Sequence, residues 1–432
     1  MATFTLFLYS SLFLIFLITL KLLFKTKRFK NLPPGPPPLP IIGNLNLLEK
    51  PLHRFFQTMS KKHGDVFSLW FGSRLAVVIS SPTAFQECFT KHDVILANRP
   101  KNLSGKHIFY NYTTVGSCSY GEHWRNLRRI VATDVLSSQR ILSFSGIRKD
   151  ETHRLVQKLA KDSSSEFAPV ELTSTFRDMT YNNMMRMIAG KRYYGEDSEL
   201  KDVDEAKEFR ETVTELLKLA GVSNKADYLP FLKWFDFEDS SGATLEWAFC
   251  NLLNNPEVLK KAKDELDTQI GQDRLLNEAD LPKLPYLKYI VQETLRLYPP
   301  APLLIPHVSS EDITVEGFNI PSDTLVIVNG WGMQRDPKFW SDATSFKPER
   351  FEKEGEEKKL IAFGLGRRAC PGEFMAMHGV SFTLGLLIQC FDWKRVSAEE
   401  IDMEEQTWFN LTKLLPLKAM CKTRPVVNKN LK

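Results

Sequence analysis

The chain has 432 residues, of which 43% are hydrophobic and 11% aromatic, so it can bury a large core. Its formal net charge is +5, from 57 basic and 52 acidic residues. The excess of positive charge equals the five basic residues before position 31, namely Lys21, Lys25, Lys27, Arg28 and Lys30. The remainder of the chain therefore nets to zero, which excludes the broad basic surface of a nucleic-acid-binding protein.

Residues 4–24 form an apolar run that predicts a membrane-spanning helix. Its 21 residues would rise about 31 Å, enough to cross a bilayer core. A cleaved signal peptide is the alternative, but it requires positive charge before the run and a small-residue cleavage site after it. Here the charges follow the run, so we expect residues 1–30 to be a single anchor with a cytosolic basic flank. The body of the protein then faces the cytosol.

The proline-rich stretch 31–45 predicts a stiff hinge or spacer, with a generic linker or an SH3-type ligand as the alternatives. Residues 46–432 predict one mainly α-helical domain with a small β region. Alternating apolar and polar residues around Gly72-Ser73 favour a β-hairpin over 65–82, and Pro82 favours a helix start. Further helices are expected at 121–136, in most of 150–220, at 284–298 and at 372–391, with strands within 313–331.

Six scattered cysteines without a CxxC motif suit a reducing compartment and argue against disulfides. One of them, Cys370, lies in the stretch FGLGRRACPG. It precedes a predicted helix N-terminus, which favours a thiolate, and Gly366 and Gly372 permit tight turns that point amide N–H groups at the sulfur. Arg368 could pair with a carboxylate on a bound cofactor. The alternative for any buried cysteine is an inert hydrophobic side chain.

Phe363, Gly366, Arg368, Cys370 and Gly372 together resemble the haem-binding signature of the cytochrome P450 monooxygenases. Such a five-position pattern would arise by chance on the order of once in ten thousand chains of this length. The resemblance runs over nearly the whole chain, because PPGP, WRNLR, ETLR and PERF occur in the family's order. The stretches LSGKHIFYNYTTVGS, WFDFE and FKPERFEKEGEEKKLI resemble a plant microsomal subfamily that includes isoflavone and flavonoid hydroxylases.

This resemblance implies a haem b cofactor with Cys370 as the iron ligand. The expected haem-propionate residues are Trp124, Arg128, His307 and Arg368. The family's structural trio, which locks the core behind the haem, corresponds to Glu293, Arg296 and Arg350. Taken singly, each of these has an ordinary alternative, such as a solvated helix face for WRNLR, a hydrogen-bonded core histidine, or a surface pair between Glu293 and Arg296.

The resemblance further implies a monooxygenase of the endoplasmic reticulum membrane. It would hydroxylate a small apolar aromatic substrate with O₂ and with electrons from NADPH that a cytochrome P450 reductase delivers. Substrate is expected at the 103–117 loop, at 301–304 and near Phe409. No zinc-protease, P-loop, serine-hydrolase or dinucleotide-binding motif competes with this interpretation.

The chain departs from the family at residues 236–239. The stretch DSSGATLEWA resembles the second half of the oxygen-side helix, which makes Asp239 and Ser240 the candidate proton-relay pair. The residues before it resemble a much earlier loop, so about 60–80 residues of lid and helix are expected to be missing. In that case Asp239 and Ser240 could be ordinary helix N-caps. A catalytically impaired haem-binding or partner-binding protein, from a truncated splice form or gene model, is the alternative function.

Overall fold

The computed structural model describes residues 9–11, 13–14, 29–101, 103–163, 166–195, 202–221, 240–406 and 410–430. The predicted anchor therefore lies almost wholly outside the described residues, as does the predicted junction at 236–239. Within the described ranges, no helix combines the length and the apolar character that a membrane crossing requires.

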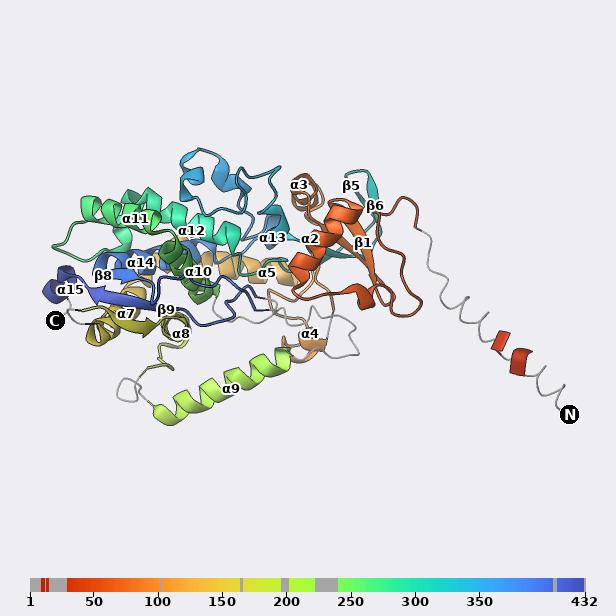
Figure 1. Ribbon diagram of the computed structural model, residues 1–432. Coiled ribbons are helices and arrows are strands. Elements are labelled where there is room, and N and C mark those ends of the chain that lie inside the picture. Colours follow the sequence, from red (N-terminus) through yellow and green to blue (C-terminus); the bar gives the residue numbers. More distant parts are fainter. Residues whose placement is uncertain are drawn as a thin grey trace.

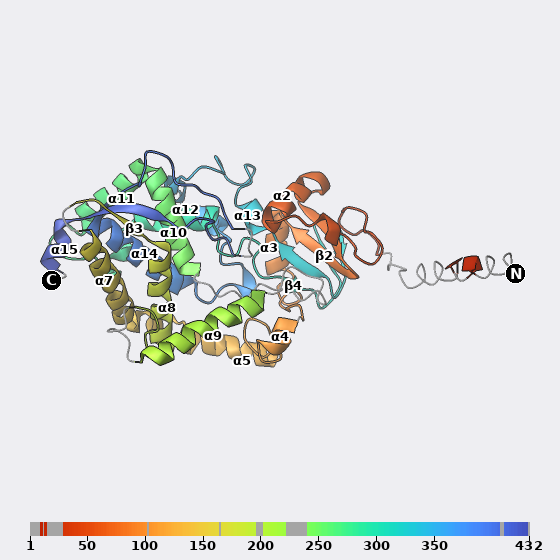
Figure 2. The same ribbon diagram turned by 60° about the horizontal axis from the view of Figure 1, so that its bottom comes forward.

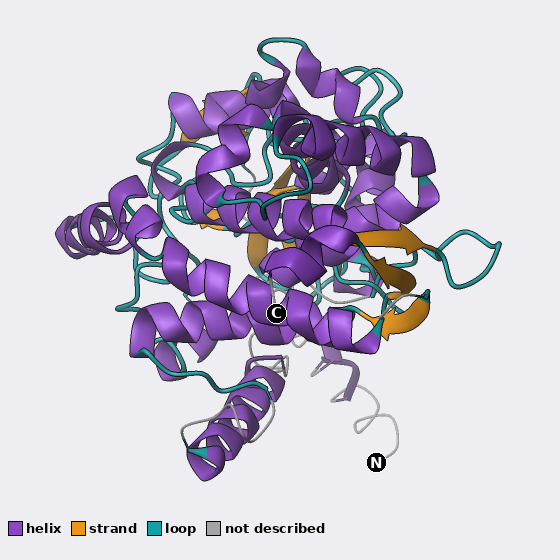
Figure 3. Cartoon of the chain, turned by 90° about the vertical axis from the view of Figure 1, so that its left-hand side faces the viewer, coloured by secondary structure: helices purple, strands orange, loops and turns teal. Residues whose placement is uncertain are grey.

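Helices dominate the fold, as the composition and periodicity predict (Figure 3). The α-helices are α2 (Leu52–His63), α3 (Pro82–Thr90), α4 (Leu103–His107), α5 (Glu122–Ile130), α6 (Ser138–Ser143), α7 (Ser145–Asp162), α8 (Thr173–Ala189), α9 (Val203–Gly221), α10 (Ser240–Asn254), α11 (Pro256–Gln269), α12 (Pro285–Leu297), α13 (Gly330–Met333), α14 (Glu373–Cys390) and α15 (Pro425–Asn430). A π-helical turn, Val131–Val135, continues α5.

The strands form three small sheets. The largest has the order β1-β2-β7-β4, in which only the β2–β7 pair is parallel. A second sheet has the order β3-β9-β8, and β5 and β6 form a hairpin. The strand bounds are β1 (Val66–Phe71), β2 (Arg74–Ile79), β3 (Ala168–Glu171), β4 (His307–Val308), β5 (Ile313–Val315), β6 (Phe318–Ile320), β7 (Leu325–Val328), β8 (Phe391–Lys394) and β9 (Lys418–Thr423). The predicted hairpin over 65–82 is confirmed.

Most of the long helices lie at one end of the molecule, and the main sheet lies at the other end together with α2 and α3 (Figure 1). The largest hydrophobic core joins α7, α8, α10, α11, α12 and α14 with the second sheet. Because α14 is apolar almost throughout, its residues 380–390 are all buried. This helix begins just after the cysteine loop, so the core fixes the position of that loop. Helix α9 lies away from this core, with one end near α4 (Figure 1, Figure 2).

The proline-rich stretch lies against β1. The Ser68 N–H donates to the carbonyl of Pro34 at 2.8 Å, and the Ser68 hydroxyl donates to that of Pro33 at 2.8 Å. Farther along, the N–H of Trp70 donates to the Asn44 side chain at 2.8 Å. Proline has no N–H of its own, so the sheet supplies the donors that hold this stretch.

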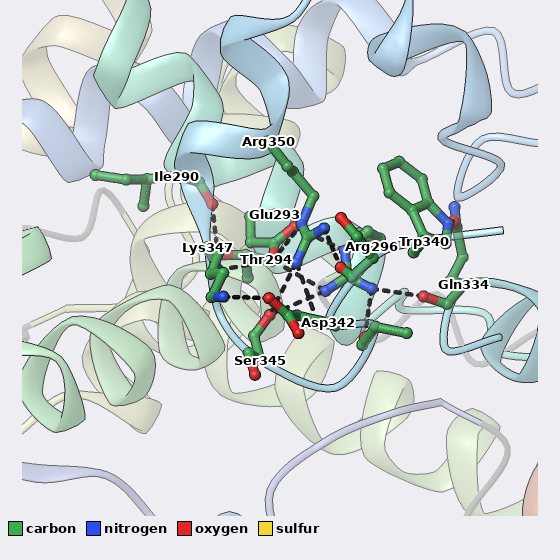
Figure 4. Close-up of polar contacts among 12 residues, drawn as sticks. Ile290, Glu293, Thr294, Arg296, Gln334, Trp340, Asp342, Ser345, Lys347 and Arg350 are labelled. Atoms are coloured by element: carbon green, nitrogen blue, oxygen red, sulfur yellow. Dashed lines mark hydrogen bonds and ion pairs between the residues drawn. The ribbon is translucent and has the colours of Figure 1, made fainter. Parts of the chain in front are cut away.

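Behind the helical core, Glu293, Arg296 and Arg350 form the ion-pair trio that the family resemblance implies (Figure 4). Glu293 accepts from Arg296 Nε at 2.7 Å and from Arg350 Nε at 3.0 Å. Arg296 also donates to the backbone carbonyls of Gln334 and Ala343, at 2.6 and 2.7 Å. The side chains of Glu293 and Arg296 are 0% exposed, so the surface-pair alternative is excluded. The trio joins α12 to the loop that contains Arg350.

The trio should be costly to break. Replacing Glu293 by Gln leaves the buried Arg296 without a negative partner, and we expect the free energy of unfolding to fall by about 3–5 kcal/mol. Thermal or denaturant unfolding measures this change. The matched control is Asp273→Asn, which removes an exposed pair with Lys429 and should leave stability unchanged. Equal losses in both variants would contradict a structural role for the trio.

Candidate functional site

Cys370 is the exposed member of six free cysteines, and the other five are buried. Its N–H donates to the carbonyl of Phe363 at 2.8 Å and closes the loop that the signature predicts. Partial burial raises the pKa of the Cys370 thiol, whereas the Gly372 N–H and the Arg128 guanidinium lower it. The interpretation as an inert buried cysteine is therefore wrong, because the sulfur is accessible and faces an N–H donor and a cation.

The cysteine loop needs left-handed backbone at Gly364 and Gly366, where φ is 73° in both cases. A Cβ on Gly366 would lie 2.4 Å from the Asp93 carboxylate and 2.7 Å from the Phe89 carbonyl, so only glycine fits there. Gly372 lies in a turn directly before α14, but its φ of −93° does not require glycine. Gly372 is also the N-cap of α14, and a Cβ added to it would lie 3.8 Å from Sγ of Cys370.

Asp93 contacts the cysteine loop, and no sequence motif predicted this contact. Its carboxylate accepts from the N–H of Arg367 at 2.9 Å and pairs with the Arg367 guanidinium at 3.3 Å. These contacts hold the cysteine loop against the end of α3. No local pattern around Asp93 indicates a contact with a residue 274 positions away.

Trp124 and Arg368 lie in contact beside the loop. The Arg368 guanidinium lies 4.5 Å from the centroid of the Trp124 ring and donates to the backbone carbonyls of residues 97, 115 and 118. The Trp124 side chain is buried, and its indole N–H has no hydrogen-bond partner among the described residues. Burial lowers the pKa of Arg368 to about 10, and repulsion from Arg128 adds to this effect. The two predicted α5 residues, Trp124 and Arg128, thus meet Arg368 in one place.

Arg99 joins this cluster and was missed by the sequence reasoning. It is 8% exposed and donates to the carbonyls of Ile305 and Pro306, at 2.8 and 2.7 Å. Its Nε is buried without a partner among the described residues. Burial, followed by repulsion from Arg368, holds its pKa well below the usual range. The available signal was a lone arginine between the apolar run VILA and Pro100.

His307 follows directly after the two carbonyls that Arg99 binds. It is 5% exposed, and its Nδ1 lies 2.6 Å from the carbonyl of Leu96. Since a carbonyl can only accept, Nδ1 carries the hydrogen and neutral His307 presents Nε2 as an acceptor. Burial and the neighbouring Arg99 hold the pKa of His307 well below its usual range. His307 can therefore donate from Nε2 to a carboxylate only if the negative charge of that carboxylate raises the pKa of the imidazole enough to keep it protonated.

The chemistry of this cluster fits the carboxylates of a haem. Arg99, Arg128 and Arg368 have no carboxylate partner within the described ranges, although Arg99 is buried and Arg128 and Arg368 are half-buried. Buried positive charge of this kind requires a counter-charge. A haem has two propionates, and Cys370, which with Arg128 lines a cavity of about 720 Å³, supplies a ligand for its iron.

The predicted relay and substrate positions are only partly described. Ser240 is the first residue of α10 and is exposed, and its carbonyl accepts from the Thr244 hydroxyl at 2.7 Å. Asp239 and Phe409 lie outside the described residues. The relay role of Asp239 and Ser240 and their alternative as N-caps both remain predictions.

Comparisons with known proteins show the family and the fold of this chain. Residues 33–241 and 238–421 match the family profile described as Cytochrome P450. The chain is 55% identical to an isoflavone 2′-hydroxylase of Glycyrrhiza echinata, over 98% of this chain and 97% of the relative. It is 52% identical to an isoflavone 3′-hydroxylase of Medicago truncatula, over 98% and 99%. A zebrafish cytochrome P450 solved with abiraterone has the same fold, with a TM-score of 0.72 at 24% identity, over 87% of this chain and 100% of that one.

The alignments also contain gaps opposite this chain. The alignment with the Glycyrrhiza relative spans 487 positions, whereas this chain has 432 residues, so at least 55 positions of the alignment stand opposite gaps in this chain. The family profile matches in two stretches that meet at residues 238–241.

Replacing Cys370 by Ser should abolish the haem–thiolate absorption, because a hydroxyl does not supply the anionic sulfur ligand. The measurement is the reduced carbon monoxide difference spectrum of the full chain, together with haem content. Cys421→Ser is the matched control, since Cys421 is buried in the second sheet, and its spectrum should equal that of the wild type. An unchanged spectrum in Cys370→Ser would contradict this assignment.

Arg99→Leu and Arg368→Leu should each lower the haem bound per chain, because each removes a cation that we assign to the propionates. A charge-assisted hydrogen bond of about 1.5–3 kcal/mol implies a loss of roughly tenfold or more in haem affinity. Arg367→Leu is the control, because Arg367 neighbours Arg368 in sequence but pairs with Asp93. A similar loss of haem affinity in the control variant would contradict the assignment, because it would indicate general damage to the cysteine loop.

Proposed function

This chain belongs to the cytochrome P450 family of haem-dependent monooxygenases, and on that basis we propose that it hydroxylates a small apolar aromatic compound of the flavonoid or isoflavonoid class. The observation that carries the proposal is the accessible Cys370 thiol beside three arginines that have no carboxylate partner in the described chain. The substrate class rests on the isoflavone hydroxylases to which the chain is 52–55% identical.

The residues of the chain hold the cofactor and keep it in place. We assign Cys370 to the iron, and Arg99, Trp124, Arg128, Arg368 and His307 to the propionates. When bound, the haem supplies the chemistry of reductive O₂ activation and transfer of one oxygen atom to the substrate. The negative charge of the carboxylate that His307 binds would raise the pKa of the imidazole, so that Nε2 takes up a proton from solvent and donates it to that carboxylate.

We further propose that the electrons come from NADPH through a cytochrome P450 reductase, and that the chain acts at the endoplasmic reticulum membrane. The support is the apolar run 4–24 with its basic flank, together with the family to which the chain belongs. Residues 301–304, which follow α12 and precede His307, are the described segment that we assign to substrate contact.

A second candidate function has its own support. The gaps, which cover at least 55 alignment positions, and the break in the family match at 238–241 agree with a missing internal segment at the start of α10. Without that segment the oxygen side of the haem would be open to water, which favours wasteful side reactions over hydroxylation. The chain would then be a membrane-anchored haem-binding protein of low activity.

One reconstitution separates the two functions. The full chain is combined with a plant P450 reductase, NADPH and an isoflavone under ¹⁸O₂, and the product is analysed by mass spectrometry. We expect a hydroxylated isoflavone that carries one ¹⁸O atom, because a monooxygenase transfers one atom of O₂.

A second chain, in which the Glycyrrhiza segment is inserted at residues 238–241, serves as the control. Product from the restored chain alone, with a carbon monoxide spectrum from both, would favour the impaired function for this chain. Product from neither chain, with both spectra intact, would contradict the proposed substrate class.

A further inference from the structure

The segment assigned to substrate contact is supported at two backbone carbonyls. The N–H of Leu411 donates to the carbonyl of Pro300 at 3.1 Å, and the N–H of Trp331 donates to the carbonyl of Pro302 at 2.9 Å. The two donors come from different parts of the chain. They hold the residues between the end of α12 and His307 from two sides.

This segment contains a strained residue. Leu304 has a φ of 49°, in the left-handed region that a branched side chain adopts only where its surroundings enforce it. Its N–H closes a turn with the carbonyl of Ala301 at 3.0 Å, and its side chain is buried. Since such strain costs on the order of 1–3 kcal/mol, the conformation depends on its supports.

Both of the donors that support the segment, Trp331 and Leu411, are connected to His53 of α2. The His53 ring lies 4.8 Å from the ring of Trp331, measured between centroids. Its Nε2 lies 2.8 Å from Oε1 of Glu405, and the side chains of His53 and Glu405 are only 2% and 6% exposed. The backbone carbonyl of His53 accepts from Asn329 Nδ2 at 3.2 Å, which ties the backbone of α2 at His53 to the start of α13.

Glu405 lies on a short hairpin that carries Leu411. Glu405 forms an antiparallel bridge with Lys413, and the N–H of Gln406 donates to the carbonyl of Thr412 at 2.9 Å. The carboxylate also pairs with Arg54 at 2.5 Å. These hydrogen bonds from His53 and Arg54 hold the pKa of Glu405 at about 2 against the opposing effect of burial, so the carboxylate is ionised at neutral pH.

From this arrangement we infer that His53 and Glu405 are positioning residues, which act through Trp331 and the hairpin to hold segment 300–304 in its strained conformation for substrate binding. The inference rests on the proposed function, which assigns that segment to the substrate. No motif marks the pair, because its members lie 352 residues apart in sequence.

Hydrogen exchange on the full haem-loaded chain tests the inference without any substrate. In Glu405→Leu, both bonds to the carboxylate are lost, and we expect the amides of Leu304 and Trp331 to exchange at least about tenfold faster. Glu405→Gln keeps an acceptor for His53, and we expect the amides of Leu304 and Trp331 to retain most of their protection from exchange. Asp267→Asn is the matched control, because it removes a comparable pair with Arg424, at 2.7 Å, between α11 and α15 at the far end of the molecule (Figure 1).

Faster exchange at Leu411 and its hairpin neighbours alone, with Leu304 and Trp331 unchanged, would overturn the inference, because the pair would then lock only the hairpin. Equal acceleration in Asp267→Asn would also overturn it.

Isoflavone binding, followed as the substrate-induced shift of the haem spectrum, provides the second readout. In Glu405→Leu we expect the carbon monoxide spectrum to be retained and the isoflavone dissociation constant to rise by about tenfold. An unchanged constant alongside faster exchange would overturn the substrate part of the inference. If the wild type itself shows no isoflavone binding, the proposed substrate class fails, and the exchange data still decide whether His53 and Glu405 hold the segment.

Discussion

Burial of positive charge without a protein counter-charge is the constraint on which this site depends. Arg99, Arg128 and Arg368 come from the loop after α3, from α5 and from the cysteine loop, and no described carboxylate neutralises them. A fold tolerates such a cluster only if a ligand supplies the negative charge. The thiol of Cys370 lies at the same place, so one group with an iron and two carboxylates satisfies every member.

A second arginine site in the same chain shows the opposite arrangement. Arg296 and Arg350 share the carboxylate of Glu293, and Arg296 also has two backbone acceptors. That site is complete within the protein and joins α12 to the loop of residue 350. The contrast separates Arg296 and Arg350, which the protein itself neutralises, from Arg99, Arg128 and Arg368, which have no carboxylate partner among the described residues.

The sequence predicts those parts of the fold that local patterns determine. The hairpin over β1 and β2 follows from alternation, α14 from an unbroken apolar run, and the cysteine loop and the Glu293 trio from spaced motifs. Local patterns did not predict the roles of Arg99, Asp93 and the His53–Glu405 pair, because each depends on contacts between residues more than 200 positions apart. The turn expected at Gly372 is present but does not require glycine, because spacing gives residue type and not φ.

The bonds from Arg99 to the carbonyls of Ile305 and Pro306 have a consequence for the lifetime of the newly made polypeptide. In the chain without haem, Arg368 repels the guanidinium of Arg99, which holds the segment before β4 by these two hydrogen bonds. A ligand that binds only the native state stabilises it by mass action. If the propionates bind this guanidinium as we propose, we expect the abundance of the chain in a cell to depend on haem supply, because chains without haem unfold more often and are degraded by proteases.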